Sequence, residues 1–390
     1  MAVKETISPT SEQHPLTTPD MDNLLGILRD ALAINPPRYL SSIFGLPQTW
    51  MAPKHRFSEF QVIDFWRLER SIRYVLNVTI PSIPQTPPAS GWPLLNSFFW
   101  KPTVILQRPD HYGSYTSFPY ESWFFINGVM TNDAVAQVNA AYLSYLFHRP
   151  ITLIQNSTCG IFADLIECAI GKEWHRTTEA AAKAFPAIYD ALKSEKRRVV
   201  VIAHSQGTII AAVVLRMLGA ITEVSKQAVL GGGFQEIYAE PEFVFPDHEE
   251  IRLSDFETLS EEELTKLELY CFANCATKMP YFRAAADGVR PMPWIESFGN
   301  EYDIVARLGM QAPNSDKWGI HIDGPRYVVS NTWGHLLNEH YLRFVHEHQK
   351  VRYIKRGQGG VAPYQLINPD SFSPDLTPRL FAYINGGSPT

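Results

Sequence analysis

One stretch constrains the fold more than any other, because a buried strand pattern runs through a tight turn into a helix pattern. Residues 199–202 are Val, Val, Val and Ile, a β-branched run typical of a central parallel strand buried on both faces. Ala203, Ser205 and Gly207 then form a small-x-Ser-x-small pentapeptide, and an apolar helix pattern follows from Ile209. Small residues two before and two after the serine let the strand and the helix approach closely. The stretch predicts a strand, a strained turn at Ser205 and a helix.

Strand and helix patterns alternate on both sides of this stretch. Strands are expected at 103–106, 123–126, 151–154, 267–272, 294–298 and 327–329, and helices at 134–146, 161–170, 179–192, 304–308 and 336–348. Such alternation predicts an α/β fold with a mostly parallel central sheet and helices on both faces.

The two ends of the chain depart from this alternation. Residues 1–20 are expected to be a flexible leader, and residues 21–100 an N-terminal extension with helices at 22–33 and 57–78. The Pro- and aromatic-rich residues 80–100 predict either a cap over a pocket or a loop that only covers the core. The main domain is expected at 101–350, with a solvated acidic insertion around 231–263. Residues 351–390 show no periodicity and predict an irregular tail.

Composition narrows the class of protein and of partner. Of the 390 residues 45% are hydrophobic and 19% charged, so a large buried core is expected. The net charge is −6, and the one tight basic cluster, residues 196–198, stands before a strand, which argues against a nucleic-acid partner. No apolar signal segment and no run of about 18 apolar residues occurs, so a cytoplasmic protein without a transmembrane segment is expected.

The four cysteines, at positions 159, 168, 271 and 275, are too few for a disulfide framework in a chain this long. Cys271 and Cys275 have a C-x3-C spacing, but no second pair with zinc-like spacing accompanies them. We therefore expect buried free thiols and no metal.

The pentapeptide around Ser205 resembles the nucleophile elbow of the α/β-hydrolase superfamily, as found in lipase- and esterase-like serine hydrolases. The usual pattern is G-x-S-x-G, and Ala203 at the first position matches some lipases of the superfamily. The resemblance covers roughly residues 100–350 and implies an α/β-hydrolase catalytic domain with Ser205 as nucleophile. The helix N-terminus at Ser205 also favours developing negative charge. The alternative is an ordinary serine in a strand-to-helix turn.

The superfamily places its acid and its histidine after the nucleophile, in that order. Asp303 lies just past the strand expected at 294–298, and the resemblance implies that it is the acid. A capping role on the next helix is its alternative, and Glu301 and Asp323 are the reserve acids. His335 follows the strand at 327–329 and a turn, as the resemblance implies for the base.

Other histidines compete for the role of base or lie close to it. His340 and His321 are the reserve candidates and are otherwise surface or packing residues. His204, next to the nucleophile, is expected to pack, because consecutive side chains in an elbow point in different directions.

Acyl transfer also needs N–H donors for an oxyanion. Gln206 supplies the first, and the loop Asn127, Gly128 and Val129 is the candidate for the second. Gly128 allows a close backbone approach, although a tight turn explains it equally well. Residues 155–160 also follow a strand and either line the pocket or cap the next helix.

The resemblance therefore implies a serine hydrolase that cleaves a carboxylic ester, or a related acyl bond, of an apolar small molecule or lipid. No metal or organic cofactor is expected, because triad chemistry needs none and no dinucleotide-binding Gly pattern is present. Two alternatives stay open. The same acyl-enzyme could serve an acyltransferase or a cyclising enzyme, or the chain could be an inert α/β-hydrolase scaffold that binds a partner.

Overall fold

The computed structural model describes part of the chain, and most of the expected strands lie in the described residues. They are residues 55–61, 104–128, 131, 133–156, 179–222, 251, 253–283, 289–313, 315, 317, 319–329, 332–343, 345, 351–356, 364–366 and 378–389. Several predictions fall outside these ranges: the leader at 1–20, the helices at 22–33 and 161–170, the segment at 80–100, Val129, residues 157–160 and residues 231–250 of the acidic insertion.

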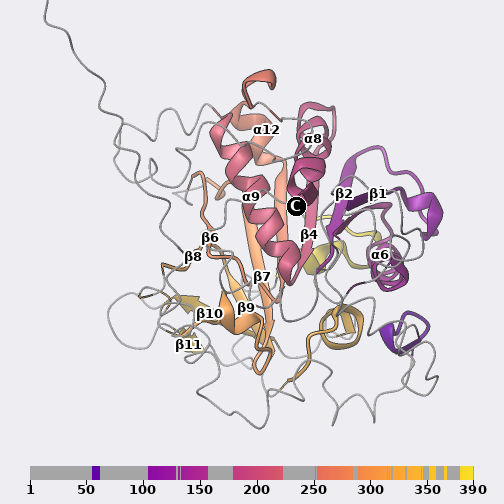
Figure 1. Ribbon diagram of the computed structural model, residues 1–390, viewed down its shortest axis with the longest axis vertical. Helices are drawn as coiled ribbons and strands as arrows, with labels where there is room; N and C mark the ends of the chain where they lie inside the picture. Colours follow the sequence, from indigo (N-terminus) through magenta and orange to yellow (C-terminus); the bar gives the residue numbers. More distant parts are fainter. Residues whose placement is uncertain are drawn as a thin grey trace, which may run out of the picture.

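A nine-stranded, mostly parallel sheet forms the centre of the fold (Figure 1). Its order is β1-β3-β2-β4-β5-β7-β9-β10-β11, and the neighbours from β3 to β9 are parallel, whereas β1, β10 and β11 pair antiparallel at the edges. The strands are β1 (Val104–Gln107), β2 (Glu121–Ile126), β3 (Ile151–Asn156), β4 (Arg198–His204), β5 (Leu267–Phe272), β7 (Trp294–Asn300), β9 (Arg326–Val329), β10 (Val351–Arg356) and β11 (Tyr364–Leu366). A separate two-stranded sheet pairs β6 (Lys278–Met279) with β8 (His321–Ile322).

The helices connect and cover these strands. They are α6 (Asp133–Phe147), α8 (Glu179–Lys193), α9 (Gln206–Ala220), α12 (Glu261–Thr265) and the π-helix η6 (Leu337–Leu342). Short 3-10 turns are η1 (Glu59–Gln61), η2 (Pro109–His111), η4 (Leu253–Asp255), η5 (Ala306–Leu308) and η9 (Arg379–Gly386). None of the described helices is long and apolar enough to cross a membrane. The expected α/β class with a mostly parallel central sheet is confirmed.

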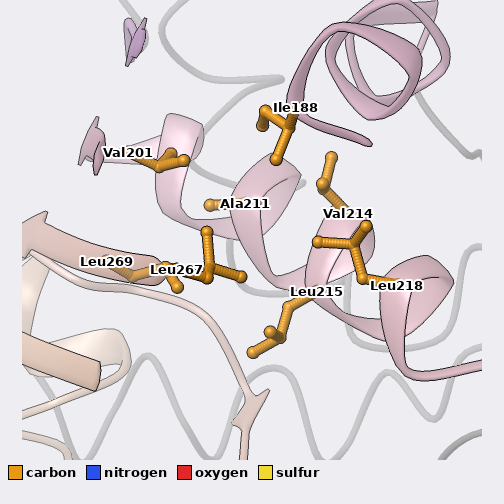
Figure 2. Close-up of a pocket in the computed structure, with 8 residues that line it drawn as sticks. All are labelled: Ile188, Val201, Ala211, Val214, Leu215, Leu218, Leu267 and Leu269. Atoms are coloured by element: carbon orange, nitrogen blue, oxygen red, sulfur yellow. The ribbon is translucent and has the colours of Figure 1, made fainter. Parts of the chain in front are cut away.

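Helices α8 and α9 lie side by side across one face of the sheet (Figure 1). Figure 2 shows the small apolar void between them and the strands, lined by Ile188, Val201, Ala211, Val214, Leu215, Leu218, Leu267 and Leu269. Every lining side chain is aliphatic, so this void belongs to the core rather than to a polar site. The packing holds α9, whose first turn follows Ser205, firmly against β4 and β5.

The other face of the sheet packs against α6 and η9. The ring of Trp123 lies 5.2 Å from Phe147 of α6 and 4.9 Å from Tyr383 of η9, measured between centroids. Tyr270, from β5, contacts the same Tyr383 ring at 6.3 Å. Because Trp123 and Tyr270 alternate with the residues that face α8 and α9, the sheet is covered on both faces.

The prediction of an irregular C-terminal tail is wrong for the described part. Strand β10 pairs with both β9 and β11, and residues 378–389 dock at the start of the central strands. Arg149 donates to the carbonyl of Gly387 at 2.9 Å, Arg198 to that of Pro389 at 2.6 Å, and Tyr383 to the Glu268 carboxylate at 2.7 Å. These partners lie far away in sequence, so local periodicity gave no sign of the docking.

Two helix predictions also need correction. A regular helix was expected at 336–348, but residues 337–342 form a π-helix. A helix was expected at 57–78, and its described beginning is the 3-10 turn η1. Glu59 of this turn accepts from the backbone N–H groups of Asn338 and Glu339 at 3.2 Å each. This segment of the N-terminal extension is thereby bonded to the first turn of η6.

The helix expected at 304–308 is shorter than predicted and forms the 3-10 turn η5.

The described part of the acidic insertion is attached to the apolar core by buried leucines. Leu253 and Leu259 of that part are buried, as is Leu264 directly after it, and Ser260 forms a capping box with Glu263 at the start of α12. Asp255, Glu257, Glu261 and Glu262 are exposed, so the acidic side chains are solvated while the two leucines attach the segment to the core.

Candidate active site

Ser205 lies on a sharp turn between β4 and α9. Its backbone has φ of 57° and ψ of −129°, a strained conformation for a residue with a side chain. The turn is tied down on both sides, because Ser205 N–H donates to the carbonyl of Phe272 at 2.9 Å and Thr208 N–H donates to that of Ser205 at 2.8 Å. A Cβ on Gly207 would meet the carbonyl of Asn127 at 2.8 Å, so a larger residue there would push α9 away from the end of β2. The small residue is needed where the sequence analysis expected it.

Gly128 brings the end of β2 against the serine. A Cβ on Gly128 would lie 2.7 Å from the carbonyl oxygen of His204 and 3.1 Å from Oγ of Ser205, and would collide with Cβ of Ser205. Asn127 is fully buried, and its side-chain amide donates to the Gly128 carbonyl at 3.1 Å. Gln206 begins α9, so its backbone N–H lies at the helix N-terminus beside Ser205. Thus Asn127, Gly128 and Gln206 all adjoin the serine, whereas Val129 is not among the described residues.

Ser205, His335 and Asp303 form one continuous hydrogen-bonded chain. His335 Nε2 lies 2.8 Å from Ser205 Oγ, and His335 Nδ1 lies 2.8 Å from Asp303 Oδ2. The three residues come from the ends of β4, β7 and β9, or from the loops that follow them, 98 and 32 residues apart along the chain. The structure brings together all three residues that the sequence analysis selected.

The carboxylate of Asp303 is buried and accepts three hydrogen bonds. Burial by itself raises the pKa of an acid, but His335, Tyr341 and the N–H of Val305 outweigh that effect and hold the pKa of Asp303 below its ordinary value. The Val305 N–H donates to Oδ1 at 2.8 Å, whereas the Tyr341 hydroxyl donates to Oδ2, the same oxygen that faces His335. Asp303 is therefore a carboxylate at neutral pH, aimed at the imidazole.

The loop that carries His335 is fixed to the end of β7 by Asn300. The side-chain amide of Asn300 donates to the carbonyl of Gly334 at 2.9 Å and accepts from the Thr332 hydroxyl at 3.1 Å. On the far side, Leu336 N–H donates to Nδ1 of His340 at 2.9 Å. These bonds set the backbone immediately before and after His335.

His204 does more than pack. Its Nε2 lies 2.8 Å from the backbone carbonyl of His335, and the two rings are 4.7 Å apart between centroids. Because a carbonyl only accepts, His204 carries its proton on Nε2. Burial, and then repulsion by His335, lower the pKa of His204 to about 3, so it stays neutral beside the site. Burial likewise lowers the pKa of His340 to about 3.

The reserve candidates lie elsewhere or serve other contacts. His321 is exposed and pairs with Asp323 at 3.2 Å, and Asp323 also accepts from the Tyr281 N–H at 2.8 Å. Glu301 is only half-buried, and the carbonyl of its backbone accepts from Arg307. Gln155, in the other segment considered for the pocket, is buried and accepts from the side chain of Gln107 at 2.7 Å.

Tyr341 and Asn300 were not predicted from the sequence, because both act through contacts that no local pattern reveals. The position of Asn300, as the last residue of a strand followed three residues later by the candidate acid, was the one available signal.

The site is closed in this structure. Ser205 and Asp303 are 0% exposed and His335 is 3% exposed. The three side chains are therefore shielded from solvent in this structure. Cys271 and Cys275 are buried free thiols, and burial raises the pKa of Cys271, which keeps its sulfur protonated and unreactive.

The arrangement has the geometry for proton transfer from a hydroxyl to an imidazole backed by a carboxylate. Comparisons of the chain with protein-family models and with curated proteins found no match. The functional argument therefore depends on the geometry of the site.

Proposed function

We propose that this chain is a serine hydrolase of the α/β-hydrolase type that cleaves carboxylic esters or related acyl bonds. The observation that carries the proposal is the pair of 2.8 Å contacts that link Ser205 Oγ, His335 and Asp303. Nucleophile, orienting acid and base follow one another along the chain in the order that the superfamily uses, at the carboxyl ends of parallel strands. The strained serine on a strand-to-helix turn is a second, independent support.

Proton positions follow from the hydrogen-bond partners. Asp303 is a carboxylate and only accepts, so neutral His335 carries its proton on Nδ1 and leaves Nε2 as the acceptor for the Ser205 hydroxyl. Oγ attacks the substrate carbonyl while Nε2 takes its proton, and His335 then returns that proton to the leaving alcohol. A water molecule then attacks the acyl carbon while it loses a proton to His335, and His335 returns that proton to Ser205 Oγ as the acyl–Oγ bond breaks and the acid leaves.

The negative oxygen formed in each addition step needs donors fixed beside Ser205. The backbone N–H of Gln206, at the start of α9, is one candidate, and the loop of Asn127, Gly128 and Val129 is the other. Absence of a side chain on Gly128 is what lets this loop contact the serine.

An apolar ester of a small molecule or lipid is the proposed substrate. Tyr302 and Trp333 stack at 4.4 Å between ring centroids, and both are half-buried. Tyr302 directly precedes Asp303 in the sequence, and Trp333 precedes His335 by two residues. We propose that this aromatic pair contacts an apolar group of the substrate.

The test is covalent labelling with a fluorophosphonate, read as intact mass. We expect one adduct on the native chain and none on Ser205→Ala or His335→Ala. A second series of probes of decreasing size tests whether closure of the site limits access. Folded native protein that resists even the smallest probe would contradict the proposal and support a binding scaffold. Product analysis with ester plus an amine or alcohol acceptor distinguishes hydrolysis from acyl transfer.

A further inference from the structure

The hydroxyl of Tyr341 is part of the hydrogen-bonded chain at Asp303. The backbone N–H of Asn300 donates to this hydroxyl oxygen at 3.3 Å, and the hydroxyl donates its own proton to Oδ2 of Asp303. The assignment of donor and acceptor is unambiguous, because a carboxylate has no proton to give and the phenol has one.

Tyr341 and His335 share a single carboxylate oxygen. His335 Nδ1 lies 2.8 Å from Oδ2, the oxygen that the tyrosine hydroxyl also contacts, whereas Oδ1 accepts from the Val305 backbone. Two donors on one oxygen weaken each other's bonds, since each withdraws electron density from the shared oxygen. The tyrosine bond is therefore stronger when His335 is neutral than when it is protonated, and it disfavours the protonated imidazole.

The ring of Tyr341 is held in place by packing. It is 3% exposed and contacts Phe272 and His204 at 5.9 and 6.0 Å between ring centroids. Its backbone belongs to the π-helix η6, which starts two residues after His335. Wide helical turns of this kind are frequent at functional sites.

Four other titratable side chains of the described residues lie around the site. His204, from β4, and His340, from η6, face His335 and stay neutral because they are buried. Cys275 lies near Tyr341, and Arg343 lies near His340. Of these groups, only Tyr341 bonds directly to the carboxylate that His335 uses.

We infer that Tyr341 is a positioning residue that fixes the Asp303 carboxylate and holds the basicity of His335 down, an inference that rests on the proposed function of the Ser205–His335–Asp303 chain. A lower basicity keeps His335 unprotonated, and so ready to accept the serine proton, at a lower pH. The phenol takes part through Asp303 and does not touch the reacting atoms.

The experiment is an NMR titration of the imidazole of His335 in Tyr341→Phe, with labelled histidine and with His335→Asn to assign the signal. We expect the pKa of His335 to rise by about 0.5 to 1 unit, and the acid limb of fluorophosphonate labelling to move with it. A matched control is Tyr383→Phe, which removes another buried tyrosine-to-carboxylate bond, to Glu268, at the opposite ends of the strands. It should not move the His335 pKa.

A second variant keeps the shape of the side chain. Site-specific 3-fluorotyrosine at position 341 has a more acidic hydroxyl that donates more strongly, so the His335 pKa should fall. An unchanged His335 pKa in folded Tyr341→Phe, or in the fluorotyrosine protein if the first variant does not fold, would overturn the inference. The titration needs no turnover, so native protein that resists labelling would refute the proposed function without deciding this result.

Discussion

Replacement of Gly128 by alanine tests the contact on which the site depends. The new Cβ would lie 2.7 Å from the His204 carbonyl oxygen, 0.7 Å below the 3.4 Å at which ordinary contact begins, and it would also collide with Cβ of Ser205. Neither neighbour yields easily, since both belong to the strained turn between β4 and α9. Ser205 or the end of β2 must therefore shift, by an amount approaching 1 Å.

A shift of that size should have a small effect on stability and a large effect on the reaction rate. Overpacking at a buried turn destabilises a protein by about 1–3 kcal/mol, which lowers the midpoint of urea unfolding without unfolding the chain at neutral pH. Misplacement by about 1 Å reduces catalytic rates by roughly 100-fold, because the 2.8 Å Ser205–His335 bond no longer forms. We therefore expect fluorophosphonate labelling of Gly128→Ala to slow by about 100-fold while the fold persists.

The assay is the second-order labelling rate at pH 7.5, with urea unfolding measured on the same samples. Gly113→Ala is the matched control, because its nearest new contacts are Ser144 Oγ at 3.1 Å and the Pro109 carbonyl at 3.2 Å, away from the serine. It should label at the native rate. If Gly128→Ala labels as fast as Gly113→Ala and is equally stable, the backbone of Gly128 does not lie against the nucleophile and the reasoning fails.

Two further predictions concern stability. Burial raises the pKa of Glu59 from 4.5 to about 8. Protonated Glu59 therefore contributes fully to the free energy of unfolding below pH 4.5, and this contribution is lost as the pH rises toward 8. Relative to Glu59→Gln, the unfolding free energy of the native chain should fall by about 3 kcal/mol from pH 4.5 to 7. The same pH dependence of the unfolding free energy in both proteins, measured with urea, would contradict this. Leu215→Ala, in the wall of the apolar void, should lower stability by about 2–5 kcal/mol, whereas exposed Leu106→Ala should change it by less than about 0.5 kcal/mol in the same assay.

Most strands were predictable because their signals are local. The expected strand at 267–272 matches β5, and those at 123–126, 151–154 and 294–298 lie inside β2, β3 and β7. Buried parallel strands carry nearly continuous apolar runs, and such runs are legible in any window of six residues. Strands β10 and β11, at the antiparallel end of the sheet, were missed, because their pairing partners, and not their own composition, make them strands.

The residues of the candidate site also differ in how far they could be predicted from the sequence. The elbow around Ser205 could be read from its own residues, since the turn itself demands small neighbours. Asp303 and His335 were selected by their places after expected strands, together with the superfamily resemblance. Tyr341 and the contact of His204 with the His335 loop had no such signal. The Tyr341 contact depends on how η6 packs at the end of β7, and the His204 contact on how β4 meets the loop before η6.

The sequence by itself determined the order of strands and helices, the strained serine turn and the residues able to complete an acyl-transfer chain, because each depends on local patterning and chemistry. Only the tertiary structure decided that His335 lies 2.8 Å from both the Ser205 hydroxyl and the Asp303 carboxylate. It also decided that Tyr341 shares the aspartate oxygen and that the C-terminal segment docks at the far end of the strands. Hydrogen bonds act over about 3 Å, whereas these partners lie up to 238 residues apart, so only the packed sheet and its loops can set those distances.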